Sequence, residues 1–339
     1  MNVDRFRGAD HEWDAFGSSM PGWTAFHRYG WRSLIESLYG HDCPFLSSRD
    51  VTGALTGILP LVRVRSRLLG HYLVSMPFVS YGGPLGSDDA VRALASHAAR
   101  MAEEDGARLL ELRSAHRLPI ALPVSHRKLT VVLSLDGGAD AVFGRLKPKV
   151  RSQVRRPNKE GVSYRFGREC VDDFHAVFAR HMRDLGTPAQ PRSFFRAIAN
   201  RFGDDAWFGC AYLNSQPIAC GAGLRWNDEF EITWASSLRE WNRISANMGL
   251  YWAFIERACA GGLSRFNFGR CTPGSPTHRY KQQWGARDEP LWWYQLSSQP
   301  EAGTPSQDSP HFALASRAWR HLPVGVATAL GGRIVRFLP

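Results

Sequence analysis

The chain has 339 residues, and its 44% hydrophobic and 22% charged content is that of a globular protein, so extensive disorder is excluded and two domains are expected. A total of 42 Lys and Arg against 31 Asp and Glu gives a net charge of +11, which favours binding to polyanions such as RNA or an anionic membrane face. The N-terminus lacks the apolar segment of a signal peptide, and no stretch is long enough to span a membrane. We therefore expect a cytoplasmic protein.

The first half of the chain is predicted to mix helices and strands. Apolar residues at helical spacing mark a helix over 31–39, and Ser87 followed by two acids can cap another over 90–104. A further helix is expected to begin near Gly138. Runs rich in β-branched and aromatic residues predict strands over 54–64, 71–81, 107–114 and 129–135.

The second half repeats this order of elements. Its predicted helices cover 171–184, 192–201 and 245–260, and its predicted strands cover 206–213, 217–225, 229–235, 264–269 and 291–296. The pattern predicts an α+β protein with mixed sheets, built as two tandem copies of one architecture. We expect a first domain over 1–145, a second over 146–298, and a linker with a C-terminal tail over 299–339.

A strongly basic segment, Arg145–Arg168, lies at the expected domain boundary, with nine basic residues against one acid. Arg151 and Arg155 are four positions apart, so they share a face if this stretch is helical, and Pro157 is expected to end the helix. The paired donors of arginine match phosphate oxygens. The segment is therefore either a phosphate-binding ridge or a solvated linker helix.

A second basic feature is a loop rich in turn residues between two late strands, over 266–286. Such a loop often lies at the mouth of a cleft, where a lysine can stabilise an oxyanion or a phosphate. The alternative is a basic hairpin loop packed by Tyr280 and Trp284. The basic groups that would share one opening are Arg270, His278, Arg279 and Lys281.

Other catalytic machinery is not indicated. The sequence has no nucleophile elbow, no zinc-protease, Walker-type or dinucleotide-binding motif, and no His or Cys at metal-ligand spacing, so no metal site is expected. Acids near a strand start could include a general base, although acids are common at strand ends. They are Asp228, Glu229 and Glu231.

The C-terminal tail over 311–339 has four arginines and no acidic residue. Phe312, Ala315, Trp319 and Leu322 fall at helical spacing, which predicts an amphipathic helix. Such a segment can lie on an anionic membrane surface, or it can dock onto the body of the protein. Either burial would satisfy the apolar stripe, so both alternatives remain open.

Two blocks, LKPKVRSQVRRPNKEGV and FNFGRCTPGSPTHRYKQQWGA, resemble the FemAB-related transferases. Together with the segment over 57–85 and the tail, they are most similar to the subgroup associated with exosortase (PEP-CTERM) and exopolysaccharide gene clusters. The resemblance covers nearly the whole chain. It implies tandem GNAT-like acyltransferase domains, the first on the acceptor side and the second on the catalytic, donor side.

The activity implied by this resemblance is N-acyl transfer. An aminoacyl group would pass from aminoacyl-tRNA, used as a cosubstrate with no tightly bound cofactor, to an amine of a cell-envelope or exopolysaccharide precursor. Lys281 would assist at the reacting ester with Arg270 nearby, and Tyr280 and Trp284 would lie beside them. Arg151 and Arg155 would hold phosphates, while Ser80 and Tyr81 would belong to the acceptor cleft.

The donor and the partners have alternatives. The pyrophosphate signature of GNAT enzymes should follow the strand over 229–235, and SSLREWNRISANMGL there does not fit it, which argues against acetyl-CoA. A longer acyl-CoA or an acyl-carrier protein remains an alternative donor, and charge alone also allows a non-catalytic RNA- or membrane-binding protein. The expected acceptor is an amine-bearing saccharide or lipid-linked molecule. Contact with the inner face of the cell membrane through 311–339 would make the protein peripheral.

Overall fold

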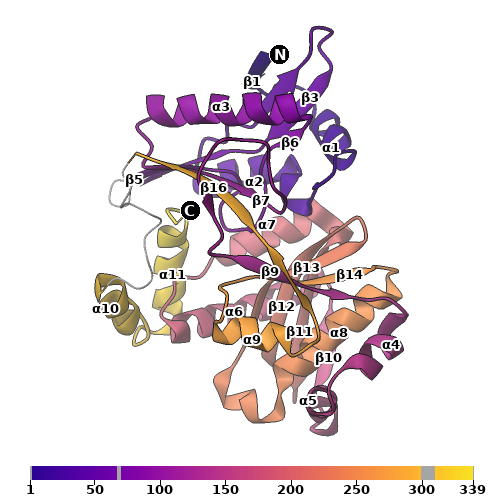
Figure 1. Cartoon of the computed structure of the whole chain (residues 1–339). Helices are drawn as coiled ribbons and strands as arrows, with labels where there is room; N and C mark the ends of the chain where they lie inside the picture. Colours follow the sequence, from indigo (N-terminus) through magenta and orange to yellow (C-terminus); the bar gives the residue numbers. More distant parts are fainter. Residues whose placement is uncertain (1, 67–69, 299–309, 339) are drawn as a thin grey trace. The chain divides into compact units, whose positions relative to one another are not determined.

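The computed structural model describes residues 2–66, 70–298 and 310–338, and these form two compact units (Figure 1). The described residues of unit 1 fall within Met1–Lys128, Pro290–Ser309 and Arg336–Pro339. Those of unit 2 fall within Leu129–Glu289 and Pro310–Val335. None of the helices in these described ranges is both long enough and apolar enough to cross a bilayer.

Unit 1 holds two sheets, one with the strand order β1-β2-β3-β6 and one with the order β4-β5-β7-β16-β8. Helix α3 begins after Ser87, whose side chain accepts a hydrogen bond from the Ala90 backbone at 3.3 Å, and its Leu94 and Ala98 are fully buried against the sheets. The elements are β1 (Asn2–Arg5), α1 (Asp10–Ser18), η1 (Ala25–His27), α2 (Gly30–Tyr39), β2 (Leu46–Arg49), β3 (Leu55–Leu59), β4 (Val62–Ser66), β5 (Gly70–Val74), β6 (Leu85–Gly86), α3 (Asp88–Glu104), β7 (Leu109–Ser114), β8 (Val124–Ser125) and β16 (Trp292–Ser297).

Unit 2 is built on one seven-stranded sheet with the order β10-β11-β12-β13-β14-β9-β15. Its strands are β9 (Leu129–Ser134), β10 (Ser163–Phe166), β11 (Ala206–Leu213), β12 (Gln216–Trp226), β13 (Glu229–Ser237), β14 (Arg265–Cys271) and β15 (Arg287–Pro290). Its helices are α4 (Gly138–Arg145), α5 (Pro148–Lys159), η2 (Arg168–Cys170), α6 (Val171–Leu185), α7 (Arg192–Phe202), η3 (Gly203–Asp205), η4 (Arg239–Ile244), α8 (Ala246–Ala260), α9 (Pro276–Gln282), α10 (Pro310–Trp319) and α11 (Val324–Val335).

Helices cover both faces of the unit 2 sheet. Trp207 stacks on Phe230 on the side of α8, with ring centroids 4.5 Å apart, whereas the next residue, Phe208, meets Phe174 of α6 at 5.4 Å. Neighbouring residues of a strand point to opposite faces, so α6 and α8 lie on opposite sides of the sheet. Both faces are apolar, which explains the near-continuous burial of β11 and β12.

The C-terminal tail folds as two helices, α10 and α11, that pack against α6 of unit 2. Ala327, Gly331 and Val335 form the buried line of α11, and a Cβ on Gly331 would lie only 3.0 Å from the Ala189 backbone. The alternative in which the tail docks onto the body of the protein is therefore observed for one side of α11. The expected linker over 299–309 and the side chain of Phe312 lie outside the described residues.

Most predicted elements are confirmed with shifted ends, and two strand assignments are wrong. The strand expected over 54–64 is interrupted at Pro60, and its parts, β3 and β4, belong to different sheets. The strand expected over 71–81 ends at Val74, because Met76 and Phe78 adopt φ angles of 56° and 74° that no strand allows. Within the late loop, a short helix, α9, occupies residues that were expected to be irregular.

Strands β9 and β16 are confirmed as strands, but they were expected in the first and second domains respectively. Strand β9 pairs with β14 of unit 2, and β16 pairs with β7 and β8 of unit 1. The structure therefore divides at 128/129 and at 289/290, whereas the sequence pattern placed the divisions at 145/146 and 298/299. The local pattern of residues identifies a strand, but the strand with which it pairs is decided by residues far away in the sequence.

Candidate active site at the separation of two parallel strands

The site in unit 2 begins where β13 and its parallel neighbour β14 stop pairing. Their register runs from Glu229 opposite Arg265 to Glu231 opposite Asn267, and no further pair follows within the described residues. On its other edge, β13 carries a bulge: Ile232 and Trp234 face consecutive residues of β12, so Thr233 is the extra residue. A bulge leaves backbone groups outside the ladder, and such irregularities often occur next to active sites.

Two carboxylates on the same face of β13 have different surroundings. Glu229 is paired, because it accepts hydrogen bonds from Arg265 and Asn267, each at 2.7 Å. Glu231 is fully buried, with Oε1 accepting from the Thr233 hydroxyl at 3.2 Å and Oε2 without a hydrogen-bond partner among the described residues. Burial, reinforced by the neighbouring Glu229 charge, raises the pKa of Glu231 to about 8.

Lys281 lies at the same place. It comes from α9, which begins after Ser275, whose side chain accepts from the His278 backbone at 3.1 Å. The side chain is 4% exposed, and its Nζ donates to the carbonyl oxygens of Gly269 and Arg270 at 2.6 and 2.9 Å. Burial lowers the pKa of Lys281 to about 8. A solvent-facing lysine would have contradicted the expected role, and this lysine is buried.

Gly269 brings the two groups together. It has a φ of 71°, and its carbonyl accepts from Lys281, while a Cβ added to it would lie 3.7 Å from Oε1 of Glu231. The charge of each group shifts the pKa of the other toward its charged form. Arg270 is half-buried next to them, and its charge lowers the pKa of both groups. Among the described residues, this is a buried acid–base pair at a break in the sheet.

Tyr280 and Trp284 lie beside Lys281 in an aromatic cluster with Tyr251 of α8. The Tyr251 ring lies 5.5 Å from Tyr280 and 6.2 Å from Trp284. Burial raises the pKa of Tyr280, and the Tyr280 hydroxyl and the Trp284 Nε1 have no hydrogen-bond partner within geometric limits among the described residues. Their role in binding a substrate stays a prediction.

The remaining basic residues of this loop serve the loop itself. His278 is buried, with Nδ1 accepting from the Gly274 backbone at 2.9 Å and Nε2 2.9 Å from Asp288. Arg279 donates to the Gly274 carbonyl at 2.5 Å. Of the four basic groups expected over one opening, the structure therefore brings Lys281 and Arg270 together and uses the other two to shape the turn.

The basic helix is α5, and Pro157 lies inside it instead of ending it. Arg151 donates from Nη1 to the carbonyls of Gly144 and Leu146, at 3.1 and 3.0 Å, so it holds the end of α4. Arg155 is exposed, and its guanidinium lies 4.8 Å from the ring centre of Phe143. The shared helix face is as expected, but the two arginines have different partners.

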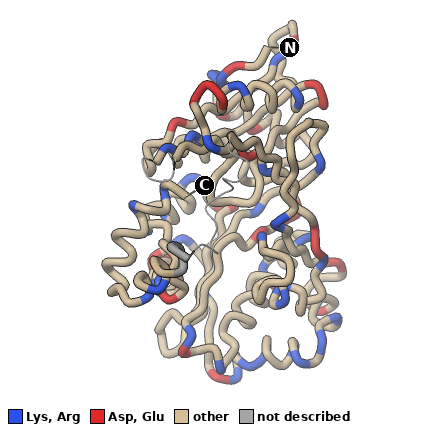
Figure 2. Tube along the Cα trace, turned by 60° about the vertical axis from the view of Figure 1, so that its left-hand side comes forward, with Lys and Arg blue, Asp and Glu red and all other residues tan. Residues whose placement is uncertain are grey.

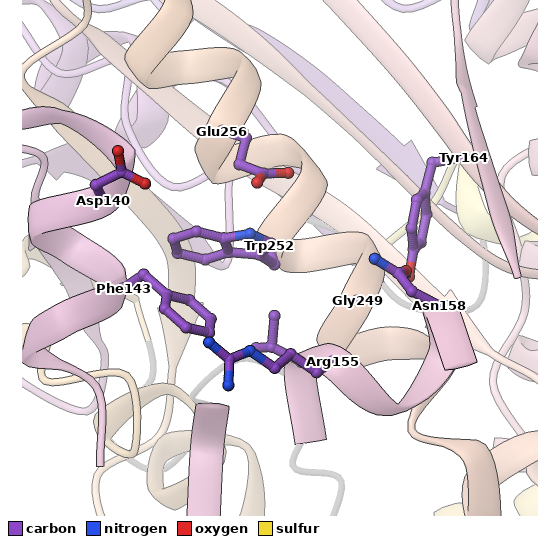
Figure 3. A pocket seen from close by; sticks show the side chains of 9 residues that line it. Asp140, Phe143, Arg155, Asn158, Tyr164, Gly249, Trp252 and Glu256 are labelled. Carbon is purple, nitrogen blue, oxygen red and sulfur yellow. The ribbon is translucent and has the colours of Figure 1, made fainter. Parts of the chain in front are cut away.

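Arg155 borders an open hollow of about 290 Å³ between α4, α5 and α8 (Figure 3). Neither Glu231 nor Lys281 lines it. The aromatic and charged residues that line the hollow are Phe143, Tyr164, Trp252, Asp140, Arg155 and Glu256. Outside this hollow, Lys and Arg occur along the traces of both units with acids among them (Figure 2).

The segment after β13, over 236–250, forms the 3-10 helix η4 and the start of α8. Ser245 precedes α8 with a φ of 59°, and Arg156 of α5 donates to the Arg243 carbonyl at 2.9 Å. A Cβ on Gly249 would collide with the Tyr164 hydroxyl at 1.9 Å, so α8 is closely covered there. This segment has neither the sequence nor the open glycine-rich turn of a pyrophosphate loop.

Ser80 and Tyr81 lie in unit 1, in the buried segment 75–83. The Ser80 carbonyl accepts from Trp293 Nε1 at 3.3 Å, and the Tyr81 ring stacks on Phe26 at 6.0 Å. Both residues are at most 3% exposed. The expectation that they contact an acceptor stays a prediction.

The sequence pattern did not distinguish Glu231 from its neighbours. It is one of three acids near a strand start, where acids are common. The available signal was the pattern EFEITW, in which two acids alternate with apolar residues inside a strand. Alternation puts both acids on one face, but only the bulge and the end of pairing show that one of them lacks a partner.

Known proteins are similar to this chain in sequence over part of unit 2 and in fold over most of its length. Residues 147–282 match the family described as an acetyltransferase (GNAT) domain. FemX superposes with a TM-score of 0.66 at 14% identity, over 87% of this chain and 98% of that one. The C-terminal domain of a protein assigned as a lysylphosphatidylglycerol synthetase in Agrobacterium fabrum gives 0.54 at 11% identity, over 79% and 87%.

A tandem GNAT protein from the clavulanic acid biosynthesis pathway gives a TM-score of 0.50 at 12% identity, over 77% of this chain and 85% of that one. A search of curated proteins by sequence found no match. The expected fold class is confirmed, and the expectation of an acyltransferase, in place of a non-catalytic binding protein, is confirmed at the level of the matched domain. The match to the acetyltransferase (GNAT) domain therefore falls entirely within unit 2.

Proposed function

We propose that this protein is an N-acyltransferase of the FemAB-related, exosortase-associated subgroup. It transfers an aminoacyl group from aminoacyl-tRNA to an amine on a cell-envelope or exopolysaccharide precursor. The observation that carries the proposal is the buried pair of Glu231 and Lys281, with one Glu231 oxygen unpartnered among the described residues, at the break between β13 and β14. Functional sites are where pKa values are shifted toward the pH of the reaction.

The pair supplies what amide formation needs. The acceptor amine is protonated at neutral pH, and Glu231 in its ionised form, which becomes abundant as the pH approaches its pKa of about 8, takes that proton so that the nitrogen attacks the ester carbonyl. A C–N bond forms and the C–O bond to the ribose breaks. The proton held by Glu231 then passes to the departing ribose oxygen, and the attacking nitrogen gives its second proton to Glu231, which releases it to solvent. Neither a covalent enzyme intermediate nor another reactant is required.

The developing oxyanion needs positive charge or donors. Lys281 supplies both, because two of its three ammonium hydrogens bond the carbonyls of Gly269 and Arg270, and the third can point to the substrate. The half-buried Arg270 adds to the local positive charge. Removing one such donor in comparable sites costs about 10²–10³ in kcat.

An ester of a nucleic acid is the preferred donor for two reasons. The covered segment over 236–250 lacks a pyrophosphate loop, which argues against acetyl-CoA. The hollow beside Arg155 offers the face of Trp252 for stacking and a guanidinium for phosphate, and these are the groups that bind single-stranded nucleic acid ends. Helix α8 contributes Trp252 to this hollow and Tyr251 to the cluster beside Lys281.

The structural neighbours support an aminoacyl donor and an envelope acceptor. The lysylphosphatidylglycerol synthetase is named for a lysyl-bearing lipid, and FemX gives the higher TM-score of the neighbours described above. A thioester of CoA or of an acyl-carrier protein remains the rival donor. We further propose a peripheral location at the inner face of the cell membrane, close to a lipid-linked or amine-bearing saccharide acceptor.

A donor competition assay tests the proposal. The purified protein is incubated with an amine-bearing amino sugar acceptor and, in separate reactions, with mixed aminoacyl-tRNA, with acyl-CoA esters, or with acylated carrier protein. Mass spectrometry of the acceptor is expected to show an aminoacyl addition only with the tRNA. The Lys281→Met variant should lose it, and Arg92→Met, at an exposed position of α3 in unit 1, should not. Acyl addition from a thioester alone would overturn the donor assignment.

A further inference from the structure

The C-terminal helices of unit 2 carry two apolar stripes where one would suffice to dock them. On α11, Ala327, Gly331 and Val335 are spaced by four and buried. One residue earlier in each turn, Val326, Leu330 and Ile334 form a second stripe with the same spacing. These three side chains are 45%, 39% and 38% exposed. We call them the outer stripe.

The two stripes cannot exchange roles. Small residues on the buried side let α11 approach the segment before α7, and a Cβ on Gly331 would lie 3.0 and 3.1 Å from the Ala189 backbone N and O. The outer stripe carries large branched side chains that would not fit at this distance. The packing of α11 therefore holds the outer stripe away from the core.

Exposed aliphatic side chains concentrate in this part of the molecule. Of the seven large hydrophobic residues that are highly exposed in the described chain, five belong to α11, α10 or the end of α6. Besides the outer stripe they are Leu314, 70% exposed, and Leu185. Helix α10 is held near Leu185, whose carbonyl accepts from Ser316 and Arg320, each at 3.4 Å. Exposed apolar side chains gathered on α6 and on two helices that pack against it are typical of interaction sites.

The charge around these side chains is positive. Arg317, Arg320 and Arg333 are exposed, and residues 310–339 include no acid. Arg333 directly precedes Ile334, so it borders the outer stripe. Two acids of α6 and η4 are paired with arginines, Asp184 with Arg183 at 2.7 Å and Glu240 with Arg180 at 2.6 Å.

We propose that the outer face of α10 and α11, comprising the outer stripe, Leu314 and the three arginines, is a docking surface for an anionic lipid bilayer. Branched aliphatic side chains would enter the boundary between headgroups and acyl chains, and the arginines would contact lipid phosphates. A second copy of the chain fits less well, since a two-fold contact would bring the arginine-rich faces together without acids to neutralise them. The surface is independent of the acyl-transfer chemistry.

Vesicle sedimentation with the full chain tests this proposal. The probes are vesicles of phosphatidylcholine alone and vesicles with about 30% phosphatidylglycerol, which gives the negative surface of a cytoplasmic leaflet. The wild-type chain is expected to bind the anionic vesicles at least about tenfold more tightly, with binding that weakens as salt rises. Absence of binding to the anionic vesicles would overturn the proposal.

Two double variants separate the contributions. Val326→Ser with Leu330→Ser should lower vesicle affinity roughly tenfold, because inserted apolar area is lost. Arg317→Gln with Arg333→Gln should remove the preference for anionic vesicles. The control Val51→Ser changes a fully exposed valine of unit 1 and should have no effect. Circular dichroism melting confirms folding, since all of these side chains point outward.

Two further outcomes have defined meanings. Unchanged vesicle binding by the Val326 and Leu330 variant would overturn the proposed surface. Light scattering that shows a dimer lost in the same variant, without vesicle binding by the wild type, would assign the surface to a second copy instead. Acyl transfer to a water-soluble amine should be unaffected in every variant, so failure of this proposal is distinguishable from failure of the proposed function.

Discussion

Both units contain a strand, a loop, a helix and a second strand parallel to the first. The units differ in how the glutamate at the place where the two strands separate is hydrogen-bonded. In unit 1, β5 and β7 pair from Tyr72 opposite Leu109 to Val74 opposite Glu111. In unit 2, β13 and β14 pair over an equally short stretch that ends at Glu231. A buried glutamate lies at the end of the pairing in both units.

In unit 1 the chain satisfies that glutamate completely. Arg113 donates to Glu111 Oε1 at 2.7 Å, and Gln295 donates to Oε2 at 2.6 Å. The same arginine also donates to the carbonyls of Met76 and Val79, at 3.2 and 2.9 Å, which fixes the strained segment after β5. The crevice of unit 1 is therefore filled by its own loop.

In unit 2 the corresponding space holds Glu231 and Lys281, both with pKa values shifted toward 8, and no loop residue caps the second carboxylate oxygen in the described chain. The difference teaches that an ion pair satisfied by its own chain stabilises a fold, whereas a pair left incomplete is available for chemistry. This difference supports the proposal that catalysis takes place in unit 2.

The largest expected effect is loss of activity on changing the unpaired acid. Glu231→Gln keeps the size of the side chain and removes the base, so kcat/KM should fall by about 10²–10⁴. Steady-state kinetics with the donor identified above measures it. Glu103→Gln, at an exposed position of α3, is the matched control and should retain full activity. Activity within about threefold of wild type in Glu231→Gln would end the assignment of Glu231 as the base.

The same substitution in the two units should change stability in opposite directions. Glu111→Gln leaves the buried Arg113 charge without its partner and should lower the free energy of unfolding by about 3–5 kcal/mol. Glu231→Gln removes an acid whose ionisation is unfavourable in the folded state, and should raise the free energy of unfolding by about 3 kcal/mol at pH 7. Denaturant titration of both variants gives the comparison directly.

The pH dependence of the second effect follows from the raised pKa. The folded protein keeps the Glu231 proton up to about pH 8, while the unfolded chain releases it near 4.5. Stability contributed by the protonated form is thus complete below 4.5 and is lost as pH rises through 8. The advantage of Glu231→Gln should vanish at low pH and be greatest above pH 8. A constant advantage across pH would contradict this account.

Activity should follow a bell-shaped pH profile centred near 8. The acidic limb reports ionisation of Glu231 and the alkaline limb reports loss of the Lys281 charge, and because the two groups interact, both limbs belong to the pair. Measuring kcat/KM from about pH 6 to about pH 10 defines both limbs of the profile. Lys281→Arg should remove the alkaline limb, since arginine keeps its charge. A pH profile that is flat through pH 8 would show that the ionisation of Glu231 and Lys281 does not control catalysis.

The smallest effects distinguish two arginines of α5. Arg155→Gln should raise KM for the donor roughly tenfold with little change in kcat, because one phosphate contact is lost. Arg151→Gln should instead lower the free energy of unfolding by about 1 kcal/mol, because it holds the carbonyls that end α4, and should leave KM unchanged. Equal effects of the two substitutions on KM would restore the single phosphate-binding ridge that the sequence pattern suggested.

The sequence by itself determined the class of the protein, the order of its elements and several side chains of the site. Helical and strand periodicity are local properties, so α2, α3, α6 and the strands around β13 follow from neighbouring residues. The resemblance of two blocks to FemAB-related transferases singled out Lys281 and Arg270, and the structure places both at the break between β13 and β14.

Only the tertiary structure decided which strands pair, which acid is unpaired and which faces stay exposed. Residues distant in the chain decide that β9 pairs in unit 2 and β16 in unit 1, and that one oxygen of Glu231 has no hydrogen-bond partner among the described residues. They also decide that the outer stripe of Val326, Leu330 and Ile334 is exposed. A hydrogen-bond partner or a covering helix is chosen by the free energy of the whole fold, and local sequence does not record that choice.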